Sequence, residues 1–123
     1  MSEEDYNHLG VDIGNMDKFL SAIRNLTKSI ELNPNNSVAF YKRGYVQAKI
    51  RNFSEAISDL NNAIKINREY VEAYRLLGIC QYNSGIMYEA KKNFELALKL
   101  GDEHAEALLS LFDQHGDEND RPF

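Results

Sequence analysis

A period of 34 residues runs through the chain and constrains its fold more than any other feature. Shifting the sequence by this length brings small residues onto small ones and large residues onto large ones: Gly10, Gly44 and Gly78; Ala22, Ala56 and Ala90; Ser29, Ala63 and Ala97; Tyr6, Phe40 and Tyr74; Leu26, Leu60 and Phe94. Such spacing is typical of stacked structural repeats, in which each copy packs against its neighbours. The copies cover residues 3–36, 37–70 and 71–104.

Each copy has the pattern of two helices. In residues 37–70, helical periodicity runs from Val38 to about Ile50 and resumes after a short turn. The second apolar stripe recurs at steps of three and four residues: Ala56, Ile57, Leu60, Ala63 and Ile64. In the turn, Asn52 and Ser54 are of the residue types that cap helix N-termini. The pattern predicts an all-α fold with three helix pairs.

The recurring small residues have a steric explanation. We expect Gly44 and Ala56 to lie where the two helices of one repeat come closest, and Ala63 where the next repeat packs. A bulky side chain at these positions would push the helix axes beyond their usual separation of about 8–10 Å.

Both ends of the repeat array depart from the pattern. After His104, a seventh helix is expected over residues 105–115, where it would cover the apolar face of the last repeat. Residues 116–123 are acidic and lack apolar periodicity, and we expect a disordered tail there. The first helix contains Gly10 and Gly14, and an interior glycine costs about 1 kcal/mol relative to alanine. Fraying of residues 1–14 is therefore expected.

Composition excludes several classes of protein. The 123 residues carry a net charge of −5, although residues 37–70 hold six basic and three acidic side chains. This is far from the basic face that nucleic acid requires. No apolar run approaches the roughly 20 residues of a membrane span, and the N-terminus lacks the apolar core of a secretory signal. With a single cysteine, Cys80, we expect a cytoplasmic domain without disulfides.

No catalytic or metal-binding constellation stands out. The three histidines, His8, His104 and His115, are isolated, and a closed metal site needs about four suitable ligands. Cys80 lies among apolar residues, without the cation or histidine that would activate a thiol nucleophile. We therefore expect neither an enzyme nor a cofactor.

The repeats resemble the tetratricopeptide repeat (TPR). That family has an aromatic residue at position four of each repeat and Leu-Gly at positions seven and eight. Alanine follows at position twenty, an aromatic residue or leucine at twenty-four, alanine at twenty-seven and proline at thirty-two. The matching residues begin with Tyr6, Leu9 and Gly10 in the first copy and with Tyr74, Leu77 and Gly78 in the third. The sequence departs from this pattern at four positions. Ser29 replaces an alanine, Arg43 replaces the leucine before the glycine, and Arg68 and Asp102 replace the proline. The resemblance implies a right-handed α-solenoid.

The resemblance also implies a function as a protein-interaction scaffold or adaptor. In this family, the first helix of each repeat lines a concave groove that holds a protein or peptide segment. The corresponding groove residues are Asn7, Val11, Asn15, Tyr41, Lys42, Tyr45, Lys49, Arg75, Ile79, Tyr82 and Asn83. Tyrosines beside lysines favour an acidic or aromatic segment as the ligand.

Some members of the family grip the Glu-Glu-Val-Asp tail of chaperones with two Lys, two Asn and one Arg. The matching positions hold Asn7, Val11, Lys42, Glu72 and Leu76. Because only Lys42 could hold a carboxylate, this ligand is not expected. Two alternatives stay open: a self-associating module, in which the acidic tail could enter a neighbour's groove, and an interaction domain of a larger assembly.

Overall fold

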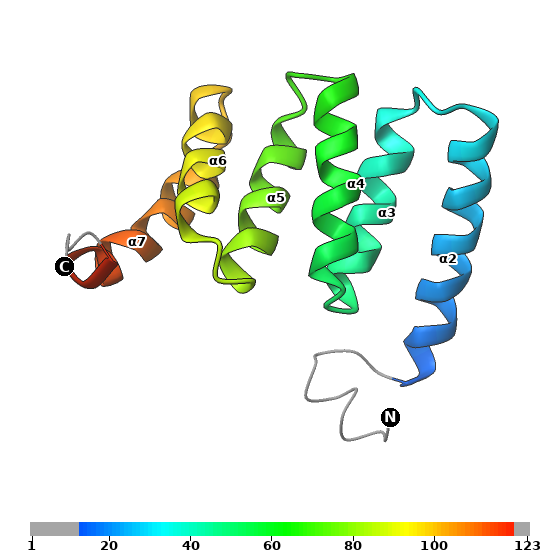
Figure 1. Cartoon of the computed structure of the whole chain (residues 1–123), viewed down its shortest axis with the longest axis horizontal. Coiled ribbons are helices and arrows are strands. Elements are labelled where there is room, and N and C mark those ends of the chain that lie inside the picture. The colour runs from blue at the N-terminus through cyan, green and yellow to red at the C-terminus, as the bar shows by residue number, and fades with distance from the viewer. Residues whose placement is uncertain (1–12, 120–123) are drawn as a thin grey trace.

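The computed structural model describes residues 13–119 of the chain, and side chains within residues 15–113. This part of the chain is helical throughout, without a strand, and Figure 1 shows its helices in order. The helices are α2 (Ile13–Leu32), α3 (Ser37–Lys49), α4 (Phe53–Ile66), α5 (Val71–Asn83), α6 (Met87–Lys99) and α7 (Ala105–Asn119). The prediction of an all-α helical repeat solenoid is confirmed.

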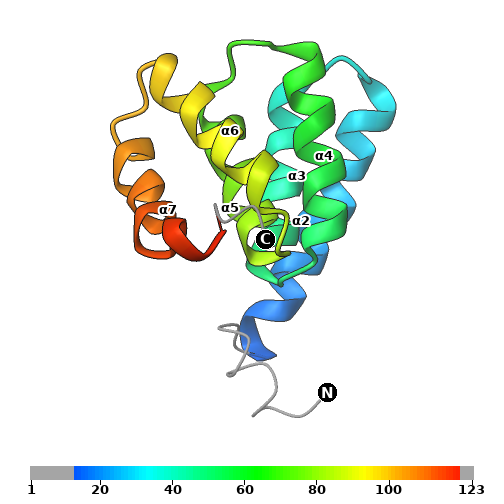
Figure 2. The ribbon, with the colours of Figure 1, turned by 60° about the vertical axis from the view of Figure 1, so that its left-hand side comes forward.

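The helices pack in the order of the chain. α3 packs on α4 and α5 on α6 within the second and third repeats, and α4 packs on α5 between them. α2 lies against α3 at one end, and α7 lies against α6 at the other. The first helices of the two repeats, α3 and α5, also touch. Turning the molecule shows α4 and α6 in front of α3 and α5 (Figure 2).

Left-handed backbone at equivalent positions closes the two turns within these repeats. Arg51 between α3 and α4 has φ 64°, and Gly85 between α5 and α6 has φ 79°. In each turn, the next residue donates its N–H to a carbonyl five residues earlier, from Asn52 to Gln47 and from Ile86 to Gln81, both at 2.8 Å. These bonds satisfy carbonyl groups that a helix end leaves free.

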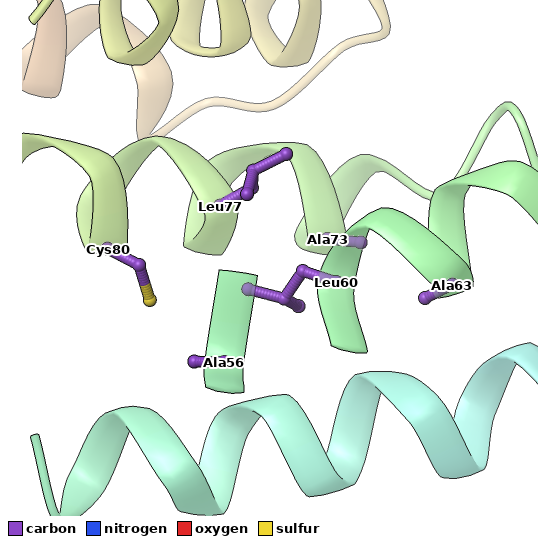
Figure 3. Close-up of a cluster of buried hydrophobic side chains, with 6 residues drawn as sticks. All are labelled: Ala56, Leu60, Ala63, Ala73, Leu77 and Cys80. Atoms are coloured by element: carbon purple, nitrogen blue, oxygen red, sulfur yellow. The ribbon is translucent and has the colours of Figure 1, made fainter. Parts of the chain in front are cut away.

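The core confirms the steric role of the small residues. A Cβ atom added to Gly44 would lie 3.0 Å from Leu60 Cγ, and one added to Gly78 would lie 2.6 Å from the Phe94 ring. The core between the second and third repeats contains Ala56, Leu60, Ala63, Ala73, Leu77 and Cys80 (Figure 3). Ala63 and Ala73 are both fully buried, as expected where consecutive repeats meet.

A second core lies between the third repeat and α7. Phe112 from α7 packs with Ala90 and Phe94 from α6. Its ring makes edge contacts with Tyr82 at 5.5 Å and with Phe94 at 5.9 Å, a geometry that aromatic pairs prefer. α7 therefore covers the apolar face of the last repeat.

The N-terminal end differs from the expectation. The turn equivalent to those at Arg51 and Gly85 falls at Asp17, but α2 runs through this position from Ile13. The sequence Met16-Asp17-Lys18 has no glycine to favour a turn, and aspartate, although a weaker helix former than alanine, is tolerated within a helix. The prediction that Gly14 and Asn15 belong to the first helix of repeat one is therefore wrong: both lie in α2. Residues 3–12, which carry the rest of that predicted helix, are outside the described residues.

The C-terminal boundary also moves. α7 continues to Asn119, so the start of the tail predicted at residue 116 is four residues too early. The sequence contains no proline before Pro122, and hence no strong helix breaker follows His115. Among the described helices, none is long and apolar enough to cross a membrane.

Candidate functional site

Tyrosines form an aromatic row on α3. Tyr41 and Tyr45 lie one turn apart, with ring centroids separated by 6.4 Å. The Tyr41 ring also packs on Tyr70, which precedes α5, at 5.0 Å. Tyr41 is half-buried by these contacts, whereas Tyr45 keeps 43% of its surface exposed. The row therefore presents one accessible ring, Tyr45, beside the half-buried Tyr41, which in turn packs on Tyr70.

Two exposed lysines flank this row. The Lys49 ammonium group lies over the Tyr45 ring, 5.2 Å from its centroid, which is within the range of a cation–π contact. Lys42 is also exposed on α3. Neither lysine has a salt-bridge partner among the described residues. Both charges are therefore available to an anionic group.

An open, mostly apolar pocket of ≈ 540 Å³ adjoins the tyrosines between α2 and α3. Its lining comes from both helices: Ala22, Asn25, Leu26, Tyr41, Lys42, Tyr45 and Val46. Three of the predicted groove residues, Tyr41, Lys42 and Tyr45, are thus brought together at this pocket. The sequence did not predict that α2 lines this pocket. Whether the apolar stripe of α2 is covered depends on how the helices pack, which the sequence pattern does not specify.

The hydroxyl groups of Tyr41 and Tyr70 stay protonated at neutral pH. Burial raises the pKa of Tyr41, and the nearby Arg75 only partly opposes this effect. Burial also raises the pKa of Tyr70. Neutral tyrosines do not repel an acidic ligand, and each keeps an O–H donor.

The predicted groove residues of α5 have internal partners. Arg75 donates from Nη1 to Asp102 Oδ1 at 2.9 Å, and Asp102 is nearly fully buried. The same oxygen accepts the N–H of His104 at 3.0 Å, so Asp102 fixes the start of α7. Arg75 therefore holds the capping helix in place, and its charge is largely satisfied within the fold.

The remaining α5 positions divide between packing and solvent. Ile79 and Tyr82 pack against the core formed with α7. Asn83 is exposed, but its side-chain amide donates to the carbonyl of Ile79 at 2.8 Å. Asn15 is exposed on α2, and Asn7 and Val11 lie outside the described residues. The accessible part of the predicted groove is therefore its α3 part.

A polar cluster near the pocket was not expected from the sequence. Arg43 makes two bonds to Asp59, from Nε at 2.9 Å and from Nη2 at 2.7 Å. Its Nη1 donates to Thr27 of α2 at 3.1 Å, which ties the first repeat to the second. The hydrogen bond to Asp59 raises the pKa of Arg43. The signal in the sequence was an arginine at a position where the other two copies have leucine, because a charged side chain that is removed from solvent is normally paired.

The described residues offer no group of three or more His, Cys, Asp or Glu side chains that could hold a metal ion. Burial raises the pKa of the Cys80 thiol to about 12, which keeps it protonated and unreactive. The α3 surface offers aromatic rings, apolar contacts and cations for non-covalent binding.

Comparison with known proteins agrees with the helical repeat architecture described above. The sequence model of the tetratricopeptide repeat family matches residues 25–58. The first TPR domain of Spaghetti (RPAP3), solved with the HSP90 peptide SRMEEVD, shares 29% identity and covers 91% of this chain and 87% of that one, with a TM-score of 0.77. The chain therefore has a tetratricopeptide repeat fold. The resemblance read from the sequence is confirmed.

Two further TPR domains extend the comparison. The first TPR domain of human RPAP3 is 27% identical over 98% of this chain and 91% of that one, with a TM-score of 0.78. The second TPR domain of human RPAP3, solved with the HSP70 peptide SGPTIEEVD, is 28% identical over 91% and 92%, with a TM-score of 0.74. No curated protein compared with the chain matches its sequence. The TPR fold is a protein-interaction fold, and two of these three similar domains were solved with peptides.

Proposed function

We propose that this TPR domain is a non-catalytic interaction module that binds a peptide segment on the α3 face. The observation that carries the proposal is the exposed Tyr45 ring with Lys49 above it, at the rim of an apolar pocket. Tyrosine offers a large contact area at a low cost in conformational entropy, which suits peptide recognition. The similarity to peptide-binding TPR domains supports the same conclusion.

The chemistry of the site favours a ligand with an apolar or aromatic side chain next to a carboxylate. The pocket of ≈ 540 Å³ falls within the roughly 300–1,000 Å³ of ordinary ligand sites and has an apolar floor of Ala22, Leu26 and Val46. Lys42 and Lys49 lie at its edge and along the tyrosine row. An acidic group beside the inserted side chain would meet these cations.

We further propose that this ligand is not a chaperone tail, although two of the similar domains were solved with peptides ending in Glu-Glu-Val-Asp. At the start of α5, the carboxylate-gripping positions are occupied by Glu72 and Leu76. Glu72 is exposed and would repel a terminal carboxylate. Arg75, the cation nearest to these positions on α5, is already paired with Asp102.

A matched pair of double variants tests the binding face. Tyr45→Ala/Lys49→Glu removes the ring and reverses the charge on α3. Tyr88→Ala/Lys92→Glu makes the same change on α6, where Lys92 lies 5.3 Å from the centroid of the 70% exposed Tyr88 ring. Proteins recovered by the wild type should be lost with the α3 variant and kept with the α6 variant, while circular dichroism shows both folded. Equal recovery by the two variants would refute the α3 site.

Titration with the two chaperone peptides tests the ligand class. SRMEEVD and SGPTIEEVD should show no saturable binding to the wild-type chain by calorimetry. The Glu72→Lys/Leu76→Arg variant restores two cations of the clamp and should bind them measurably. Saturable binding to the wild type, lost in Tyr45→Ala/Lys49→Glu, would instead identify a chaperone tail as a ligand of this face.

A further inference from the structure

The outward face of α6 exposes large apolar side chains that the repeat does not require. Among the residues with described side chains, half of the strongly exposed large apolar ones lie on α6 or beside its ends: Ile86, Tyr88, Leu96, Leu98 and Leu100. One period earlier, on α4, the positions of Tyr88 and Leu96 hold Ser54 and Asn62. Polar residues therefore serve the packing of a repeat at these positions, and a cluster of exposed apolar residues marks an interaction surface.

Six exposed residues of this face lie in one sector of the helix, and we call them the α6 stripe: Tyr88, Glu89, Lys92, Leu96, Lys99 and Leu100. At about 100° per residue, they span about 120° of the helix circumference. The buried Ala90, Phe94 and Ala97 lie on the other side, toward the core. Within the stripe, the Lys92 ammonium group lies 5.3 Å from the centroid of the Tyr88 ring. Figure 2 shows α6 in front of α5, on the outer side of the array.

The α6 stripe is arranged symmetrically about Phe94. Tyr88 and Leu100 each lie six residues from Phe94, on opposite sides of it. Glu89 and Lys99 each lie five residues from it. When a second α6 runs antiparallel across a two-fold axis near Phe94, residues at equal distances from the axis face one another. An aromatic ring then faces an apolar side chain and a carboxylate faces an ammonium group, so the helix is complementary to its own copy.

We propose that this chain forms a homodimer in which the α6 stripes of two copies pack antiparallel. In the middle, the aliphatic part of Lys92 covers Leu96 of the second copy, while its ammonium group stays in water. Glu89 forms an ion pair with Lys99 of the second copy, and neither residue has a salt-bridge partner among the described residues. A parallel pair would instead bring Glu89 to Glu89 and Lys99 to Lys99, and such like-charge contacts disfavour it.

The dimer differs from the proposed peptide binding in both surface and strength. The pocket beside the α3 tyrosines is lined from α2 and α3, whereas α6 packs on α5 and α7. Each copy therefore keeps its α3 face, and dimerisation and peptide binding can fail separately. A contact through one helix of 13 residues per copy lies well below the roughly 1,600 Å² of a standard interface, so we expect a weak, reversible dimer.

Sedimentation of the full chain without any ligand tests the dimer. The wild type should shift from monomer to dimer between about 10 and 500 µM, as expected of a small interface. A chain that stays monomeric up to about 500 µM would overturn the proposal.

Two matched variants test whether the α6 stripe is the interface. Lys99→Glu and Lys91→Glu make the same change of charge at exposed residues of α6, the first inside the stripe and the second outside it. Lys99→Glu should weaken dimerisation at least about tenfold, because two-fold symmetry places the like-charge contact in the interface twice. Lys91→Glu should change it by less than about twofold. Equal effects of the two variants, with circular dichroism showing both folded, would overturn the assignment of the stripe.

A charge exchange tests the antiparallel register. Glu89→Lys and Lys99→Glu each place like charges opposite one another in their own homodimer, whereas their heterodimer restores both opposite-charge contacts. We expect each variant alone to stay monomeric and an equimolar mixture to dimerise about as strongly as the wild type. General attraction cannot explain such a result, because each substitution changes the net charge of −5 by two and both variants stay negative.

A mixture that stays monomeric would overturn the proposed register and with it the proposal. A wild-type dimer that Tyr45→Ala/Lys49→Glu dissociates and Lys99→Glu leaves intact would overturn it as well, because the second copy would then bind at the α3 face.

Discussion

Arg43 and Asp59 form a bidentate ion pair that is largely removed from solvent, with side-chain exposures of 21% and 6%. The pair links α3 to α4, and the bond from Arg43 to Thr27 extends the link to α2. In the first and third repeats, the position of Arg43 is leucine. The second repeat therefore replaces an apolar contact by an ion pair that joins three helices.

Removing one member of this pair should be more harmful than removing both. Arg43→Leu restores the residue of the other repeats but leaves Asp59 buried without a counter-charge, and we expect a loss of about 3–5 kcal/mol in the free energy of unfolding. Arg43→Leu/Asp59→Leu should recover most of this loss. Urea unfolding at neutral pH measures both, and a single variant as stable as wild type would contradict the assignment.

Gly78→Ala should destabilise the chain more than Gly44→Ala. The new Cβ at position 78 lies 2.6 and 2.7 Å from two atoms of the Phe94 ring, and Phe94 is fully buried against Phe112 and cannot easily move. We expect a cost of about 1–3 kcal/mol, even after the better helix propensity of alanine. At position 44 the nearest atom is the side-chain Cγ of Leu60 at 3.0 Å, and the loss should be smaller.

A compensating change distinguishes this clash from a general loss of helix stability. Gly78→Ala/Phe94→Leu copies the large residue that faces Gly44 and should lose less than the sum of the two single variants. Thermal unfolding of the wild type, the two single variants and the double variant gives a double-mutant cycle. Strict additivity would show that the Phe94 ring is not the cause.

Phe112→Ala should uncover the last repeat. Phe112 is 8% exposed and contacts the rings of Tyr82 and Phe94, so its truncation creates a cavity and exposes both. We expect a loss of about 3 kcal/mol. Leu100→Ala is a suitable control, because that residue is already 37% exposed at the end of α6. Similar losses for the two variants would contradict the role of α7 as a cover.

Stability should fall in alkali partly through Cys80. Its pKa is raised from 9.0 to about 12 by burial, so the unfolded chain releases the thiol proton first as the pH rises above 9. The contribution of the Cys80 thiol to the free energy of unfolding is complete below pH 9. It decreases by at most about 1.4 kcal/mol per pH unit up to pH 12. The difference in unfolding free energy between wild type and Cys80→Ala should therefore shrink between pH 8 and pH 10. A constant difference would disprove this linkage.

The period of the sequence was enough to predict the helices of the second and third repeats and their closest contacts. Gly44 and Gly78 could be placed because a close helix pair tolerates no side chain at the contact, a requirement that depends only on local geometry. The tyrosines of α3 followed from the same register. The ends were less predictable, since no glycine enforces the turn at Asp17 and no proline stops α7 before residue 122.

The sequence by itself therefore determined the repeat and the helix pairs of its second and third copies. Only the tertiary structure decided which residues of the predicted groove are accessible. Arg75 and Asp102 are 27 residues apart in the chain, and Arg43 and Asp59 are 16 apart. Periodicity places a side chain on a face, but the free energy of a charge or ring depends on neighbours from other repeats, and these are known only once the helices have packed.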